Sequence, residues 1–419
     1  GTDAVPAAAF YGCAPLRAVH LPATVRTLGT GAFEAAPRLE TVAFAEGSAL
    51  GAVGDRAFNR CVGLRRIAVP AAVTKIGPGA FDGAGLEEVA FGEGSRLLSI
   101  ESHAFHGCKG LRAIALPAAL ARIGTYAFAQ SGLARVSFAA GGALQTIGNY
   151  AFFQNARLRE LSVPAGVRHI GSFAFGDAVR LATVAFEGGS ELEVIGDAAF
   201  SHTASLQTVA FPASVQEIGA DAFTGSGLEE ITFEEGSQLA AIKYGAFAVC
   251  KNLRVVALPP SLREIGDQAF EHCCDRLPVL TLPAGLAALG EGAFAASGVA
   301  RVRFAEGSAL QNIGKDAFYS CKRLKNVALP SSIRHIGDGA FESAGLETVT
   351  FAAGGALATI GYAAFYDSAN LTTLNLPAGV PAGRGAAAEV AVGVQAFDGT
   401  GCREGVFAPG VAVVGCQAR

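Results

Sequence analysis

The chain repeats one pattern of apolar and polar positions every 23 to 25 residues, as residues 111–133 (LRAIALPAALARIGTYAFAQSGL) illustrate. The unit reads Leu-x-x-Val-x-Leu-Pro-x-x-Val-x-x-Ile-Gly-x-x-Ala-Phe-x-x-Cys-x-x. Its opening segment ends in alternating apolar and polar residues, which predicts a short strand with one buried face. A proline, or a phenylalanine followed by a Gly-rich loop, then ends the strand in a turn.

Ala-Phe pairs mark the units along the whole chain. Each pair ends in one of seventeen phenylalanines, which are spaced by 23 to 25 residues except for a last gap of 32 residues: Phe10, Phe33, Phe58, Phe81, Phe105, Phe128, Phe152, Phe175, Phe200, Phe223, Phe247, Phe270, Phe294, Phe318, Phe341, Phe365 and Phe397. A unit this short cannot bury its own apolar face, whereas stacked units form a continuous core beside a parallel sheet. The pattern therefore predicts a repeat solenoid of about 17 repeats.

The boundaries of this solenoid follow from where the pattern holds. We expect it over residues 1–376, with a truncated first repeat, because Phe10 lacks the upstream Leu-Pro and Ile-Gly. Residues 377–419 are expected to form a degenerate last repeat and a C-terminal cap, which begins with the insertion at 381–390. Because residue 1 enters halfway into a repeat, we expect a mature or excised form of a longer chain.

A glycine stands four residues before the phenylalanine in fourteen of the sixteen full repeats. Glycine adopts a positive φ without steric penalty, so we expect a left-handed backbone at this corner. Glu101 and Lys243 replace the glycine in two repeats and are therefore expected to carry local strain.

The motif Leu-Pro-x-x-Val-x-x-Ile-Gly-x-x-Ala-Phe-x-x-Cys-x-x-Leu strongly resembles the BspA-like, or treponemal-type, class of leucine-rich repeat. The resemblance covers about residues 10–376. It implies a right-handed arc, with a parallel β-sheet on the concave side and short strand or helical turns on the convex side. It also implies a cell-surface or secreted protein that binds host or matrix proteins, so we expect an extracellular location, with a cytoplasmic one as the alternative.

Composition and charge exclude three classes of protein. The chain is 51% hydrophobic, unlike a disordered protein, yet no apolar run approaches the roughly 18 residues that a membrane span needs. Its formal net charge of −4 lacks the basic footprint of a general nucleic-acid binder. The 54 glycines, together with the absence of Met and Trp, reflect one short template copied many times.

Six of the nine cysteines stand three residues after the repeat phenylalanine: Cys13, Cys61, Cys108, Cys250, Cys273 and Cys321. We expect free thiols that fill the core as small apolar side chains. Most lie two or more repeats apart, beyond the reach of a disulfide, although Cys250 and Cys273 lie in adjacent repeats and could pair. We predict no zinc site at Glu-His-Cys-Cys (271–274), because His272 and Cys273 are expected on different faces of one turn.

Cys402 and Cys416 form a second group, because they follow the last Ala-Phe pair. A disulfide between them would close a fourteen-residue loop and stabilise the cap by about 3 kcal/mol. Such a bond would indicate an oxidising compartment. The alternative is two unpaired cysteines in a loose tail.

No arrangement of residues indicates catalysis. His169 and His335 occupy the same slot in repeats that lie seven apart, and His103 and His106 form a solvated pair on one turn. No Walker loop, nucleophile elbow or zinc-protease motif occurs, and the glycines follow the repeat rather than a phosphate loop. We therefore expect a protein that is not an enzyme and has no cofactor or metal.

The outward strand positions are the candidate binding surface. They carry mostly alanine, serine and threonine, a flat strip that either permits inward curvature or lets a partner lie close. One region departs from this strip and is the predicted patch: Val255, Val279, Arg301, Arg303 and Lys325. Apolar groups bordered by arginine are typical of interfaces, although ordinary surface variation would give the same composition.

These observations predict a monomeric, adhesin-like binding protein that holds a protein or glycan on its concave or edge face, with no nucleic-acid partner. An intracellular or structural scaffold built from the same repeats is the alternative. A minor alternative is ice or surface binding through a hydroxyl ladder of Thr348, Thr350, Thr373 and Asn375.

Overall fold

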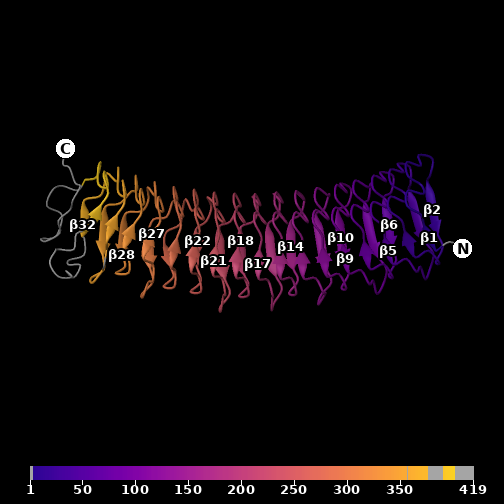
Figure 1. The fold of residues 1–419 in the computed structure, drawn as a ribbon, viewed down its shortest axis with the longest axis horizontal. Helices are drawn as coiled ribbons and strands as arrows, with labels where there is room; N and C mark the ends of the chain where they lie inside the picture. Colours follow the sequence, from indigo (N-terminus) through magenta and orange to yellow (C-terminus); the bar gives the residue numbers. More distant parts are fainter. Residues whose placement is uncertain (1–2, 356, 376–389, 402–419) are drawn as a thin grey trace. The chain divides into compact units, whose positions relative to one another are not determined.

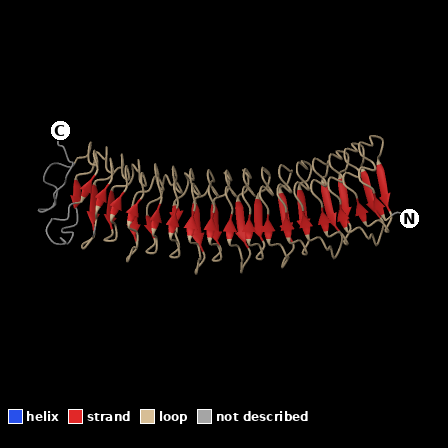
Figure 2. Cartoon of the chain, in the orientation of Figure 1, coloured by secondary structure: helices blue, strands red, loops and turns tan. Residues whose placement is uncertain are grey.

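The computed structural model describes residues 3–355, 357–375 and 390–401. The chain divides into two compact units, Gly1–Gln207 and Thr208–Arg419, here called unit 1 and unit 2. In both units the described residues form strands, turns and loops, and none of them lies in a helix (Figures 1 and 2). This part of the chain accordingly offers no helix that could cross a bilayer.

Two kinds of strand alternate along unit 1. The four-residue strands, called the long row, are β2 (Ala18–Leu21), β4 (Thr41–Phe44), β6 (Arg66–Val69), β8 (Glu88–Phe91), β10 (Ala113–Leu116), β12 (Arg135–Phe138), β14 (Glu160–Val163) and β16 (Thr183–Phe186). The two-residue strands, called the short row, are β1 (Ala4–Val5), β3 (Thr27–Leu28), β5 (Ala52–Val53), β7 (Lys75–Ile76), β9 (Ser99–Ile100), β11 (Arg122–Ile123), β13 (Thr146–Ile147), β15 (His169–Ile170) and β17 (Val194–Ile195).

Unit 2 has the same two rows. Its long row consists of β18 (Thr208–Phe211), β20 (Glu230–Phe233), β22 (Val255–Val256), β24 (Leu280–Leu282), β26 (Val302–Phe304), β28 (Asn326–Leu329), β30 (Thr348–Phe351) and β32 (Thr373–Asn375). Its short row consists of β19 (Glu217–Ile218), β21 (Ala241–Ile242), β23 (Glu264–Ile265), β25 (Ala288–Leu289), β27 (Asn312–Ile313), β29 (His335–Ile336), β31 (Thr359–Ile360) and β33 (Ala391–Val392).

The strands of each row form several sheets, and within a sheet neighbouring strands pair in parallel and in register. In the long row Ile114 of β10 lies opposite Val136 of β12, and in the short row Ile123 of β11 lies opposite Ile147 of β13. Burial alternates along β10, with Ile114 and Leu116 inside, as a strand with one covered face requires. The predicted parallel-strand solenoid is therefore confirmed, and its turns carry two-residue strands where helical turns were an option.

The core of each unit is a ladder of stacked phenylalanine rings, one from each repeat. Centroids of successive rings lie 5.1–5.3 Å apart from Phe10 to Phe200 in unit 1. They lie 5.0–5.6 Å apart from Phe223 to Phe397 in unit 2. Apart from Phe10, which opens the ladder and is 40% exposed, the rings of unit 1 are fully buried.

The repeated corner glycine has a different role from the expected one. The glycines four residues before the ring do not have a positive φ, and neither do Glu101 and Lys243. At Gly54, an added Cβ would lie 2.0 Å from the carbonyl oxygen of Leu28 in the preceding repeat. Glycine is thus needed because two backbones approach closely, and the prediction of a left-handed corner with strain at the two replacements is wrong.

Positive φ occurs instead two residues before and two residues after the ring, as at Tyr150 (55°) and Gln154 (57°) around Phe152. Both side chains reach the surface, since Tyr150 is half-buried and Gln154 is exposed. The turns that run from each short strand to the next long strand form the turn edge of a unit. Where these left-handed positions are not occupied by glycine, they supply side chains to this edge.

Candidate binding surfaces

The five residues of the predicted patch lie along the long row of unit 2. Val255 opens β22, Val279 directly precedes β24, Arg301 precedes β26, Arg303 lies within β26, and Lys325 precedes β28. The two valines are half-buried and the three basic side chains are exposed. The patch therefore extends over four strands of one row.

The structure brings three of these five residues together. The backbone N–H of Leu280 donates to the carbonyl oxygen of Arg301 at 2.8 Å, which places Val279 beside Arg301. In the parallel pairing of β24 with β26, Arg303 lies opposite Thr281. Val279, Arg301 and Arg303 form one cluster, here called the arginine cluster.

Val255 and Lys325 stand apart from the arginine cluster. The hydrogen-bonded sheet that contains Val255 ends at β22, and β24 begins the next sheet of the long row. Lys325 forms an exposed ion pair with Glu347, with Nζ 3.0 Å from Oε1. Arg301 and Arg303 have no ion-pair partner among the residues that the structure describes, so two uncompensated guanidinium groups remain at the surface.

The hydroxyl ladder considered for ice binding is interrupted at β28. Thr348 pairs with Thr373, and Thr350 pairs with Asn375, between β30 and β32. On the other side of β30, Ala328 lies opposite Thr350. A regular hydroxyl surface does not continue from β30 onto β28.

Four of the six core cysteines are free and buried: Cys61, Cys108, Cys250 and Cys321. Each thiol donates to the carbonyl oxygen of a core phenylalanine in the preceding repeat at 3.1 Å, so these side chains bond as well as fill space. Burial raises the pKa of Cys61 to about 12 and the pKa of Cys250 and of Cys321 to about 11. The prediction of free thiols is confirmed for these four and for Cys13, which is half-buried.

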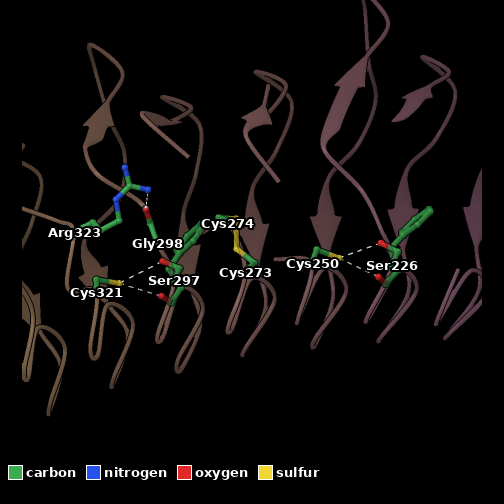
Figure 3. Close-up of a disulfide and its surroundings, with 10 residues drawn as sticks. Ser226, Cys250, Cys273, Cys274, Ser297, Gly298, Cys321 and Arg323 are labelled. Atoms are coloured by element: carbon green, nitrogen blue, oxygen red, sulfur yellow. Dashed lines mark hydrogen bonds between the residues drawn. A yellow bond between two sulfur atoms is a disulfide. The ribbon is translucent and has the colours of Figure 1, made fainter. Parts of the chain in front are cut away.

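Cys273 is the exception, because it forms a disulfide with Cys274 (Figure 3). Their Cα atoms lie 3.7 Å apart. The prediction of a free thiol at Cys273 is wrong, because it considered only partners in other repeats. Leu277 comes seven positions after Phe270, whereas the corresponding residue comes five or six positions after the ring in the other repeats, and the extra residue supplies an adjacent partner.

The extra residue is held by the repeats on both sides of it. The N–H of Cys274 donates to the carbonyl oxygen of Cys250 at 3.2 Å. The guanidinium of Arg323 donates to the carbonyl oxygen of Asp275 and to that of Gly298, and Figure 3 shows the second of these bonds. The interruption of the long row between β22 and β24 occurs at this turn. Cys402 and Cys416 lie outside the described residues, so their disulfide stays a prediction.

The histidines of the described chain form no metal site. No group of three or more His, Cys, Asp or Glu side chains in this part of the protein could hold a metal ion. Nδ1 of His106 lies 2.8 Å from Oδ1 of Asp82, and its ring meets that of His103 edge-on. Burial lowers the pKa of His103, and the nearby His106 lowers it further. His272 is exposed whereas Cys273 is buried, as expected for different faces of the turn.

Sequence reasoning missed a column of aromatic side chains on the turn edge of unit 1. His103, Tyr126, Tyr150 and Phe173 stand two residues before the core ring in four successive repeats. Their ring centroids lie 4.9, 4.5 and 4.8 Å apart, and successive rings are within 12° of parallel. The signal that could have revealed this aromatic column is the recurrence of ring side chains at one position of the repeat.

The sequence profile of the BspA type leucine-rich repeat region, which holds six copies, matches residues 2–97, 93–191, 185–300 and 296–382. The chain belongs to the BspA-type leucine-rich repeat family. The resemblance drawn from the Ile-Gly and Ala-Phe pairs is thus confirmed. The solenoid fold of this family suggests a protein-interaction scaffold, and the family is typically non-catalytic.

Solved leucine-rich repeat structures are similar to this BspA-type chain. A leucine-rich repeat protein from Bacteroides ovatus has 22% identity, covers 94% of this chain and 79% of its own, and gives a TM-score of 0.53. A leucine rich cell surface protein from Faecalibacterium prausnitzii has 20% identity, with coverages of 86% and 83% and a TM-score of 0.38. The pneumococcal vaccine antigen PcpA has 21% identity, with coverages of 65% and 74% and a TM-score of 0.37. The first likeness supports the solenoid fold, and no curated protein matches the chain.

Proposed function

We propose that the chain is a non-catalytic binding protein, secreted or displayed on a cell surface, which holds a partner against the long row of unit 2. The observation that carries this proposal is the arginine cluster. Arg301 and Arg303 are exposed without an ion-pair partner among the described residues, and Arg301 lies beside the half-buried Val279. Arginine beside an apolar group is enriched in protein interfaces, and an unpaired guanidinium attracts a partner that offers carboxylates.

Two observations support an extracellular setting. The repeat class is that of surface and secreted proteins, as the sequence resemblance implies. The Cys273–Cys274 disulfide fits an oxidising compartment, because cytosolic thiols are kept reduced. A finding of reduced Cys273 and Cys274 in protein taken from its native location would favour the scaffold alternative instead.

The arginine cluster is tested by charge reversal. Immobilised wild-type chain is incubated with surface extract and medium from the source organism, and captured proteins are identified by mass spectrometry. The double variant Arg301→Glu/Arg303→Glu should lose the captured protein, because attraction becomes repulsion. The matched control is Arg334→Glu, which reverses an exposed arginine in a turn before β29 and should capture normally. Equal capture by all three proteins would remove the cluster from the proposal.

A further inference from the structure

The aromatic column of unit 1 occupies a position where glycine would be easier to accommodate. His103, Tyr126, Tyr150 and Phe173 have φ values of 58°, 56°, 55° and 55°. A left-handed backbone is unfavourable for bulky side chains, and two other repeats of the unit use glycine at this position. Unfavourable backbone conformations that persist in several successive repeats point to a role for the side chains themselves.

Phe153 turns a ring face away from this column. Its plane stands at 83° to that of Tyr150 and at 86° to that of Phe173, with centroids 5.4 and 6.2 Å away. The rings of Tyr150 and Phe173 are stacked 4.8 Å apart and leave no room between them. Phe153 therefore covers their edges with one face and directs its other face away from the column.

Small neighbours let this ring lie against the surface. One residue after the core ring, where Phe153 stands, the adjacent repeats have Ala129 and Gly176. A Cβ added to Gly176 would lie 3.3 Å from Cδ2 and 3.4 Å from Cε2 of Phe153, so a side chain there would press on the ring. Phe153 is half-buried, whereas the core Phe152 next to it is fully buried.

A row of planar polar side chains borders Phe153. The amide of Gln130 donates to Oε1 of Gln154 at 3.0 Å, and the amide of Gln154 donates to Oδ2 of Asp177 at 3.2 Å. The backbone N–H of Gln130 also donates to the backbone carbonyl oxygen of Phe153 at 2.8 Å, which ties the turn that carries Gln130 to the turn that carries Phe153 and Gln154. Each glutamine has a second amide hydrogen, and Asp177 has a second carboxylate oxygen, available to a ligand.

We propose that Phe153, Gly176, Gln130, Gln154 and Asp177, here called the Phe153 platform, bind a saccharide (in the part of the chain between the labels β10 and β17 in Figure 1). A pyranose has a flat C–H face that packs on an aromatic ring and a rim of hydroxyls that exchange hydrogen bonds with amides and carboxylates. Aromatic anchors of protein interfaces lie instead in well-packed, water-excluding pockets. The inference rests on the proposed function only in taking the chain as a binding protein, because its site lies in the other unit.

Affinity electrophoresis tests the platform with defined probes. Wild-type chain is run in native gels that contain xylan, mixed-linkage β-glucan, galactomannan, hydroxyethylcellulose or glycol chitin. Retardation by at least one polysaccharide is expected, and Phe153→Ala should weaken it by about tenfold. Phe153→Leu should weaken it equally, because it keeps apolar volume and loses the flat ring. Gln154→Ala should weaken it to a lesser degree.

Three controls make the result decisive. Tyr319→Ala removes an exposed ring at the same repeat position in unit 2 and should leave retardation unchanged. Arg301→Glu/Arg303→Glu should also leave it unchanged, which separates this test from that of the arginine cluster. Unaltered far-ultraviolet circular dichroism shows that each variant is folded.

The proposal is overturned if no probe retards the wild-type chain or if Phe153→Ala is retarded normally. Retention of binding by Phe153→Leu would also overturn it, because an apolar side chain without a ring face would then suffice. None of these results affects the proposed function of the arginine cluster, which is measured by protein capture.

Discussion

The residue three places after the core ring donates a hydrogen bond inside many turns. Cys108 uses its thiol toward Phe81, Asn155 uses its amide, and Ser368 uses its hydroxyl, each toward the core phenylalanine carbonyl of the preceding repeat. The donor group at this position differs between repeats, but each of these side chains is small and donates a hydrogen bond. Buried carbonyl oxygens favour such donors, because their second lone pair would otherwise go unused.

Substitution of Cys108 should show that its thiol donates as well as fills space. We expect Cys108→Ala to lower the free energy of unfolding by about 1 kcal/mol, since it removes a buried hydrogen bond and some packing. Cys108→Ser should lose less, because serine occupies this place as a donor in other repeats. Urea unfolding followed by circular dichroism measures both. Cys13→Ala, at a half-buried site, is the control, and equal losses for Ala and Ser at position 108 would contradict the assignment.

At the scale of the repeat, the corner between the short strand and the turn sets how closely neighbours stack. Gly54 follows β5 directly, and its backbone approaches the carbonyl oxygens of Leu28 and Gly29. A side chain at position 54 would collide with these carbonyl oxygens and push the two repeats apart. Backbone atoms cannot retreat as a flexible side chain can, so the strain is shared by both repeats.

Gly54→Ala should therefore destabilise unit 1 by about 3 kcal/mol, as overpacking of a close contact does. Gly51→Ala is the matched control, because its φ is not positive and a Cβ there would lie 3.8 Å from its nearest neighbour. The control should unfold at the same urea concentration as the wild type. Thermal or urea unfolding measures the difference, and equal stability of the two variants would contradict the close-approach role.

The repeat, its parallel strands and its core rings were predictable because each depends on local alternation and on one recurring motif. The role of the corner glycine was not, since a close approach and a positive φ both select glycine. The Cys273–Cys274 bond was missed because only pairing between repeats was weighed. The Phe153 platform was missed because its residues come from three successive repeats. The ring of Phe153, the amides of the two glutamines and Gly176 come together only when these repeats stack.

At the scale of the whole chain, ion pairs join neighbouring repeats in both units and lie mostly at the surface. Arg65 pairs with Glu87 in unit 1, and Lys315 pairs with Glu291 in unit 2, at 3.0 and 2.7 Å. Exposed pairs contribute about 0–1 kcal/mol each and are screened by salt. The apolar ladders, rather than these charges, must therefore supply the stability.

Stability should accordingly depend little on sodium chloride. We expect the urea midpoint in about 1 M salt, where the Debye length is only about 3 Å, to stay close to that in dilute buffer. Chemical unfolding at the two salt concentrations measures this directly. A steep fall in the midpoint would instead show that the surface pairs are a major source of stability.

Successive repeats present nearly the same phenylalanine ring and backbone contacts to their neighbours. A repeat that packs one repeat out of its native position during folding would therefore still find a matching partner. Such degeneracy favours misaligned intermediates in repeat arrays. The turn at Cys273 and Cys274, with its extra residue and its hydrogen bonds to the repeats on both sides, does not match its neighbours. An alignment of unit 2 shifted by one repeat would leave the hydrogen bonds of this turn unmade, so the irregular turn distinguishes the native alignment from its neighbours.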